Sequence, residues 1–217
     1  MNGLVEQLLE SPTLPEIMDE LQARMAEERA RREKFYEKIT EDQKAEFING
    51  EIIVHSPNKV KHLADRDRLH ILVHTFVETR HLGFIAGEKA LCVFPRNDYE
   101  PDICYFSVAK AAQLKPNQLK LPVPDFIVEV LSESTASKDR PEKFEDYQAH
   151  GVREYWIIDP DGEILEQYVL QDGKYGLLQK SGTGEVKSEV IQGFVIPVRA
   201  IFDAEVQLAT LRQLLAK

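Results

Sequence analysis

Two acidic residues stand inside short apolar segments that are expected to be buried. Asp102 follows Pro101 at the start of one segment, 102–107, and Glu129 lies in the middle of the next, 125–131. A buried carboxylate must be protonated, paired with a cation or bound to a metal, because leaving its charge uncompensated is costly. Two carboxylates at one end of neighbouring strands can hold Mg²⁺, which leaves sites for water and phosphate oxygens. This pattern favours phosphodiester hydrolysis, although a structural salt bridge to a Lys or Arg would also satisfy Glu129.

Lys143 is the third candidate for this chemistry. A helix that begins at Asp139 places Lys143 in its opening turns, one turn before the apolar-stripe residue Tyr147, so that the lysine can lean towards Glu129. A lysine in that position would orient an attacking water or offset negative charge on the scissile phosphate. The alternative is an exposed helix lysine paired with Asp139 or Asp146.

Strands and helices that could position these residues alternate along the chain after residue 40. Runs of β-branched and aromatic residues predict strands, and apolar residues at helical spacing predict helices. Strands are expected at 46–55 (a hairpin around an Asn-Gly turn), 84–86, 90–94, 102–107, 125–131, 154–158, 164–169 and 175–179, and helices at 60–79, at 139–150 and at the C-terminus. This order predicts an α/β or α+β domain over residues 40–217, with a mixed central sheet flanked by helices.

Residues 1–39 are predicted to form an N-terminal helical extension. A charged helix over 16–38 carries Ile17, Leu21 and Met25 at i, i+4 spacing as a short apolar stripe. Such a stripe can bury little surface, so the helix packs either on the body or on a second copy of the chain. A homodimer is one of these two alternatives.

The charge balance limits how the protein could contact nucleic acid. The sequence has 27 Lys and Arg against 37 Asp and Glu, a formal charge of -10, which argues against a broad basic binding surface. A local basic group at the start of the 60–79 helix could still make contact, although its alternation with Asp65 and Asp67 favours a solvated face. This group comprises Lys59, Lys61, Arg66 and Arg68.

Cysteine usage and hydropathy predict a cytoplasmic protein without a membrane segment. The two cysteines, Cys92 and Cys104, lack metal-type CxxC spacing and suit a reducing compartment. The N-terminus lacks a signal-peptide pattern, and no stretch approaches the roughly 20 apolar residues of a membrane span. The sequence also lacks HExxH, GxxxxGK[ST], GxGxxG and GxSxG, so metalloprotease, P-loop ATPase, Rossmann dehydrogenase and α/β-hydrolase activities are without their required motifs.

Several separated motifs, in order along the chain, resemble the Uma-two family of restriction-endonuclease-like proteins. They fall between about residues 40 and 170. The motifs are AEFINGE at 45–51, Ser56-Pro57 with His62, RNDYEPD at 96–102, EVLS at 129–132, Asp139, Lys143 and GVREYW at 151–156.

The resemblance implies the PD-(D/E)xK nuclease fold with a Mg²⁺ or Mn²⁺ site. The implied catalytic residues are Asp102, Glu129, Lys143, Glu46 and His62, of which Asp102 and Glu129 are also the metal ligands. The motif's lysine normally stands two residues after its second acidic residue, where this chain has Leu131. In the Uma-two pattern the lysine is taken from the following helix, where Lys143 matches it.

Together these observations predict a metal-dependent endonuclease that hydrolyses phosphodiester bonds in DNA. One alternative is a non-catalytic, dimeric binding module that keeps the nuclease fold. Another is a hydrolase of a smaller phosphate ester, which would fit the acidic composition. At the level of residues, Glu46 could be a structural partner of a buried cation, and His62 a surface histidine near the start of its helix.

Overall fold

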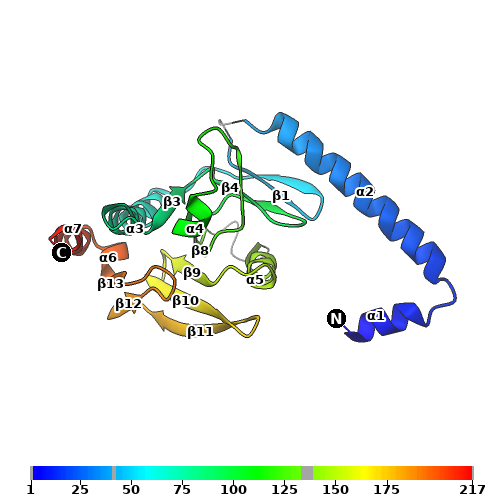
Figure 1. The fold of residues 1–217 in the computed structure, drawn as a ribbon. Helices are drawn as coiled ribbons and strands as arrows, with labels where there is room; N and C mark the ends of the chain where they lie inside the picture. Colours follow the sequence, from blue (N-terminus) through cyan, green and yellow to red (C-terminus); the bar gives the residue numbers. More distant parts are fainter. Residues whose placement is uncertain (1, 41–42, 133–138, 217) are drawn as a thin grey trace.

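A six-stranded mixed sheet forms the centre of the molecule (Figure 1). The computed structural model describes residues 2–40, 43–132 and 139–216. In spatial order the strands are β11 (Lys174–Ser181), β10 (Ile164–Gln171), β9 (Glu154–Asp159), β8 (Phe126–Val130), β6 (Ile103–Ser107) and β3 (Gly83–Gly87). Neighbouring strands are antiparallel except β8 and β9, which run parallel. The two carboxylate-bearing segments are therefore adjacent central strands, as predicted.

Three helices near the chain's middle and C-terminal end cover one face of this sheet. They are α3 (Val60–Thr79), α6 (Arg199–Phe202) and α7 (Ala204–Leu215). Alternate strand residues such as Ile103, Val128 and Trp156 share a buried cluster with Leu72 and Phe76 of α3. The period-two alternation of side chains along each strand directs this set towards the helices and the intervening set to the opposite face. The pair β12 (Glu185–Lys187) and β13 (Val195–Pro197) adds a small separate ribbon.

A second sheet and helix α5 (Asp139–Ala149) cover the opposite face. The second sheet has the order β2 (Glu51–Val54), β1 (Ala45–Ile48), β5 (Asp98–Tyr99), β4 (Leu91–Val93) and β7 (Lys120–Leu121). Cys104 and Ile127 of the central sheet share a buried cluster with Tyr99 of β5 and Tyr147 of α5. The short helix α4 (Val108–Ala111) follows β6.

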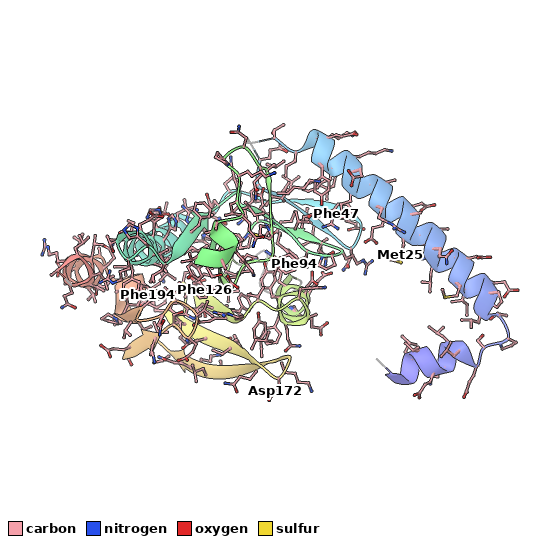
Figure 2. All side chains as sticks on the ribbon, viewed as in Figure 1. Met25, Phe47, Phe94, Phe126, Asp172 and Phe194 are labelled. Atoms are coloured by element: carbon pink, nitrogen blue, oxygen red, sulfur yellow. The ribbon has the colours of Figure 1, made fainter. Side chains whose placement is uncertain are left out.

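The N-terminal helices extend away from this body. Figure 1 shows α2 (Leu14–Lys38) running outwards, with α1 (Asn2–Leu9) at its far end. The C-terminal part of α2 is anchored, because Phe35 is buried and the Arg32 guanidinium lies 2.7 Å from the Asp98 carboxylate. Figure 2 shows Met25 on the outlying part of α2, where its side chain is 59% exposed. The N-terminal extension is thus helical. The domain boundary between residues 39 and 40 stays a prediction.

The predicted hairpin, helices and mixed α/β class are confirmed. The hairpin turns at Asn49 and Gly50, which have φ of 50° and 85°, the positive values that an Asn-Gly turn requires. Helix α1 and the short strands β5, β7 and β12 are not predicted from the sequence. The backbone of β5 pairs with Val93 of β4, five residues before Asp98, and with Phe47 of β1, a distant partner that no local pattern reveals. No described helix is long and apolar enough to cross a membrane.

Candidate active site

The pairing of β6 with β8 brings Asp102 and Glu129 together. Ile103 lies opposite Val128 in this antiparallel ladder, so the residues one step outwards, Asp102 and Glu129, also face each other. Both point to the face covered by the second sheet and α5, since each is two residues from a residue of that buried cluster. The Val130 amide fixes the Asp102 carboxylate further by donating a hydrogen bond to Oδ2 at 2.8 Å.

Asp102 is almost fully buried and has a lysine partner. Its side chain is 3% exposed, and Lys44 Nζ donates to Oδ1 at 2.9 Å. Burial alone would raise the pKa of Asp102, but Lys44, His62 and the Val130 amide outweigh it, and the pKa lies below its usual value. Asp102 is therefore ionised at neutral pH and ready to bind a cation.

Glu129 receives two hydrogen bonds from one face of α5. Lys143 Nζ and Tyr147 Oη donate to Glu129 Oε1 at 3.1 and 2.8 Å. Lys143 and Tyr147 are four residues apart, so one helical turn aligns them. Burial raises the pKa of Glu129, and Asp102 and Glu46 add to this rise while Lys143 opposes it. Additional positive charge near Glu129 would favour its ionised form.

Lys143 is buried, so the predicted alternative of an exposed helix lysine is wrong. Its side chain is 9% exposed and bridges Glu129 and Glu46, with Nζ 2.9 Å from Glu46 Oε1. Burial alone would lower the pKa of Lys143, but the two carboxylates raise it well above its usual value. Asp146, the alternative partner, instead accepts a hydrogen bond from Tyr99.

Glu46 lies behind Lys143 in β1. Its side chain is 0% exposed. The carboxylate accepts hydrogen bonds from Lys143 and from the Glu100 amide, each at 2.9 Å, and its other oxygen lies 2.9 Å from His55 Nε2. Burial opposes its ionisation, but Lys143 and His55 lower the pKa of Glu46 to about 2. This geometry matches the alternative in which Glu46 is a structural partner of a buried cation.

His62 is buried at the start of α3, so the alternative of a surface histidine is also wrong. It is 5% exposed, and its Nε2 lies 2.9 Å from the Val130 carbonyl oxygen. Since a carbonyl only accepts, Nε2 carries the hydrogen of this bond. The same nitrogen lies 3.6 Å from Asp102 Oδ2, which places the imidazole beside the carboxylate pair.

These side chains surround a small pocket of about 40 Å³. It is lined by Lys44, His55, Asn58, His62, Asp102, Glu129, Val130, Ser132 and Lys143. The volume suffices for an ion with a few waters, because one water occupies roughly 10–15 Å³ on this measure. Four of the five predicted site residues thus line one pocket, and the fifth, Glu46, lies beneath it.

The donor set at this pocket fits a hard divalent cation. Asp102 and Glu129 provide carboxylate oxygens, the ligands that Mg²⁺ takes while retaining several waters. Glu46 brings the carboxylates to three against two lysines, and this negative charge adds to burial in raising the pKa of Glu129. Among the described residues, no group of three or more His, Cys, Asp and Glu side chains forms a metal-binding cluster. The site therefore fits an ion held by two carboxylates and water.

Three further residues of the site, Lys44, His55 and Tyr147, are not predicted from the sequence. Lys44 stands two residues before Glu46, and the period-two rule for strands could have placed it on the same face. The sequence pattern places Tyr147 on the apolar stripe of α5, and the role of its hydroxyl group follows only from the position of Glu129.

The mixed sheet with its flanking helices defines a restriction-endonuclease-like fold. The chain belongs to the Uma2 family, whose model, described as "Putative restriction endonuclease", matches residues 32–199. A similar solved structure is that of "a putative nuclease belonging to DUF820" from Anabaena variabilis ATCC 29413, with 18% sequence identity and a TM-score of 0.68. The match covers 82% of this chain and 97% of that one, and at this identity it shows a shared fold. The comparison with curated proteins gave no match.

Proposed function

We propose that this protein is a metal-dependent endonuclease that hydrolyses phosphodiester bonds in DNA. The observation that carries the proposal is the convergence of Asp102, Glu129 and Lys143 on one pocket. Asp102 and Glu129 would hold Mg²⁺ or Mn²⁺. Such an ion, when bound, polarises a phosphoryl oxygen and lowers the pKa of a bound water.

Lys143 positions the attacking water or stabilises charge on the phosphate. Two hydrogens of its ammonium group point to Glu46 and Glu129, and the third can donate into the pocket. Glu46 is a positioning residue, because it is shielded from the pocket and acts by holding Lys143. His62 assists by fixing the Val130 carbonyl and by adding a polar wall beside Asp102.

Calorimetric titration of Mg²⁺ and Mn²⁺ tests the metal site. Wild type is compared with Asp102→Asn and Glu129→Gln, and the same proteins are assayed for cleavage of supercoiled plasmid. Both variants should lose metal binding, and cleavage should fall by about a hundredfold or more.

Asp125→Asn is the matched control for this test. Asp125 is also a buried carboxylate next to β8, and it pairs with Lys110 at 3.0 Å, outside the pocket. The control should bind metal and cleave plasmid like wild type. Absence of metal binding by wild type at millimolar concentration, with DNA present, would contradict the proposal.

A non-catalytic binding module is the second candidate, and one observation favours it. Asp102 and Glu129 each already have a lysine partner, Lys44 and Lys143, at 2.9 and 3.1 Å. Ion pairs could therefore satisfy the carboxylates without a metal. Metal affinity separates the two candidates, since a purely structural cluster would bind no divalent ion.

We further propose that the protein forms a homodimer through α1 and α2. Support comes from apolar side chains that these helices leave exposed: Leu4, Val5, Leu9, Met18, Leu21 and Met25. A reducing compartment such as the cytoplasm suits Cys92 and Cys104, which are free thiols with Sγ atoms 3.9 Å apart.

A further inference from the structure

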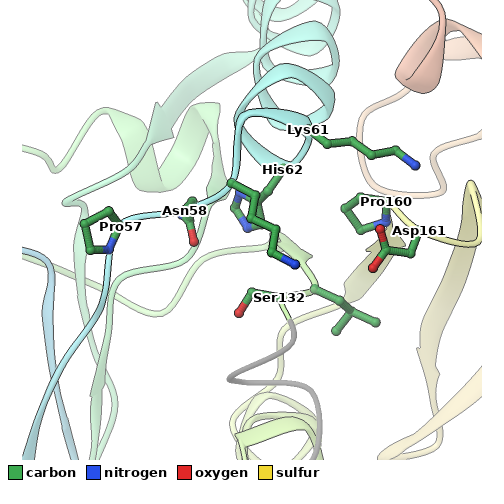
Figure 3. Close-up of a pocket in the computed structure, with 9 residues that line it drawn as sticks. Pro57, Asn58, Lys61, His62, Ser132, Pro160 and Asp161 are labelled. Atoms are coloured by element: carbon green, nitrogen blue, oxygen red, sulfur yellow. The ribbon is translucent and has the colours of Figure 1, made fainter.

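A second pocket adjoins the candidate active site. Its volume is about 160 Å³, and it shares Asn58, His62 and Ser132 with the smaller pocket. The remaining lining residues are Pro57, Lys59, Lys61, Leu131, Pro160 and Asp161. In Figure 3, Lys61 extends from α3 towards the turn that carries Pro160 and Asp161. The two pockets thus form one continuous surface at the start of α3.

The backbone at this pocket favours an anion. Helix α3 has 20 residues, begins at Val60, has no side-chain cap at Lys59 and has no acidic residue in its first turn. The first helical hydrogen bond runs from the Leu63 amide to the Lys59 carbonyl, so the preceding amides lie before the helical ladder. These amides and the helix dipole attract negative charge.

Side chains add positive charge and an unsatisfied polar atom. Lys59 and Lys61 are exposed, and among the described residues that line the pocket Asp161 is the one carboxylate. His62 is only 5% exposed, and its Nδ1 has no hydrogen-bond partner within the described part of the chain. A buried polar atom without a partner is unusual and indicates a water or ligand at the site, and because Nε2 carries the hydrogen of the bond to Val130, a neutral ring offers Nδ1 as an acceptor for a bound water.

The remaining members of the basic group predicted from the sequence do not contribute here. Arg66 pairs with Asp67 and Glu88, and Arg68 pairs with Asp65 at 2.7 Å. The two arginine side chains are only 13% and 25% exposed and are compensated by acidic neighbours, so they do not form the solvated helix face that the sequence favours. The two lysines differ because they line a pocket next to the carboxylates.

We propose that this second pocket binds the backbone phosphate of the nucleotide adjacent to the scissile phosphodiester. The proposal rests on the nuclease function proposed above and defines where the DNA strand continues beyond the catalytic pocket. Lys59, Lys61 and the amides at the start of α3 receive the phosphate, while His62 and Ser132 lie between the two phosphate positions. This local site explains how a chain with a formal charge of -10 can engage a polyanion.

Binding of DNA to a lysine-pair variant tests this site. Wild type, the double variant Lys59→Ala/Lys61→Ala and the control Lys174→Ala/Lys187→Ala are titrated into a fluorescein-labelled 20-base-pair duplex. Anisotropy is read in Ca²⁺ at several salt concentrations. The control removes the same charge from exposed positions on β11 and β12.

The lysine-pair variant should bind at least about tenfold more weakly, and its salt slope should fall by about 1, since loss of one neutralised phosphate contributes roughly 0.9. The control should stay within about twofold of wild type. Equal losses in both variants, or no binding by wild type, would overturn the proposal.

A mononucleotide ester separates failure of this site from failure of the nuclease function. Thymidine 5′-monophosphate p-nitrophenyl ester offers a phosphodiester to cleave but no neighbouring phosphate. The ratio of duplex to ester cleavage rates should fall about tenfold in the lysine-pair variant. An unchanged ratio would contradict the second phosphate site. Glu129→Gln should lose both activities, and loss of neither would contradict the nuclease function instead.

Discussion

The buried ammonium group of Lys143 is stabilised by two carboxylate partners. Its ammonium lies 2.9 Å from Glu46 and 3.1 Å from Glu129, and burial of all three groups leaves little water to replace any of them. Removing one partner of a buried ion pair typically destabilises a protein by about 3–5 kcal/mol, because the remaining charge is uncompensated. The lysine therefore has a structural as well as a chemical role.

We expect Lys143→Met to lower both activity and stability at neutral pH. Without the ammonium, the pKa values of Glu129 and Glu46 rise, so the folded state favours protonated carboxylates. A raised folded pKa gives stability that is present below the unfolded value and lost as pH rises through the folded value. The deficit of about 3–5 kcal/mol should therefore shrink as pH falls towards about 4.5.

Urea unfolding across pH 4.5–8 measures this effect. Lys180→Met is the control, because Lys180 pairs with Glu166 but is 55% exposed, and an exposed pair is worth about 1 kcal/mol or less. A pH-independent deficit in Lys143→Met would show that lost packing, rather than lost charge compensation, causes the destabilisation.

Lys44 should compete with a metal for Asp102. Its Nζ lies 2.9 Å from Oδ1, and it is the largest influence lowering the pKa of Asp102 against burial. Replacing it with Met leaves the site more negative, so the dissociation constant for Mn²⁺ should fall by about tenfold, or 1.4 kcal/mol. Calorimetry measures this change, and weaker binding in Lys44→Met would mean that Lys44 orients Asp102 for the ion.

At the scale of elements, the pairing of β3 with β6 depends on a close backbone approach. Gly83 lies opposite Ser107 with φ of 139°, and a Cβ at this position would lie 2.1 Å from the Phe106 carbonyl oxygen. Strand β6 begins directly after Asp102, so this pairing supports the strand that positions the carboxylate.

Gly83→Ala should destabilise the protein by at least about 2 kcal/mol, because the new methyl group clashes with backbone that cannot rotate away. Gly151→Ala is the matched control, since Gly151 also has positive φ, 80°, but open space around its Cβ position. The control should cost only about 1 kcal/mol. Thermal unfolding of both variants compares them, and equal losses would contradict the role of the close approach.

At the scale of the whole molecule, the outlying helices expose apolar surface that a second copy could cover. Leu21 and Met25 are 45% and 59% exposed on α2, beyond the part anchored by Arg32 and Phe35. Leu21→Glu/Met25→Glu should convert the proposed dimer to a monomer, because it places charge in an apolar contact.

Sedimentation equilibrium measures this change in mass. Leu177→Glu/Leu178→Glu is a control with similar exposure on β11, at 53% and 56%, and should leave the mass unchanged. Monomeric wild type would contradict the proposed dimer.

The sequence by itself determined the local elements and the residue types of the site. The helix over 60–79 and the Asn49-Gly50 hairpin follow from short-range periodicity and turn chemistry, which act between near neighbours. The chemical cost of Asp102 and Glu129 in apolar segments likewise required no coordinates.

Only the tertiary structure decided how these groups are compensated. Lys143 and Glu46 are 97 residues apart, and Lys44 and Asp102 are 58 apart, yet each pair makes a direct contact. Such contacts depend on how two sheets and α5 pack, and the residues between them carry no periodic signal of that packing. Burial and charge at short range then set each pKa, so the ionisation of the site also became evident only in the folded molecule.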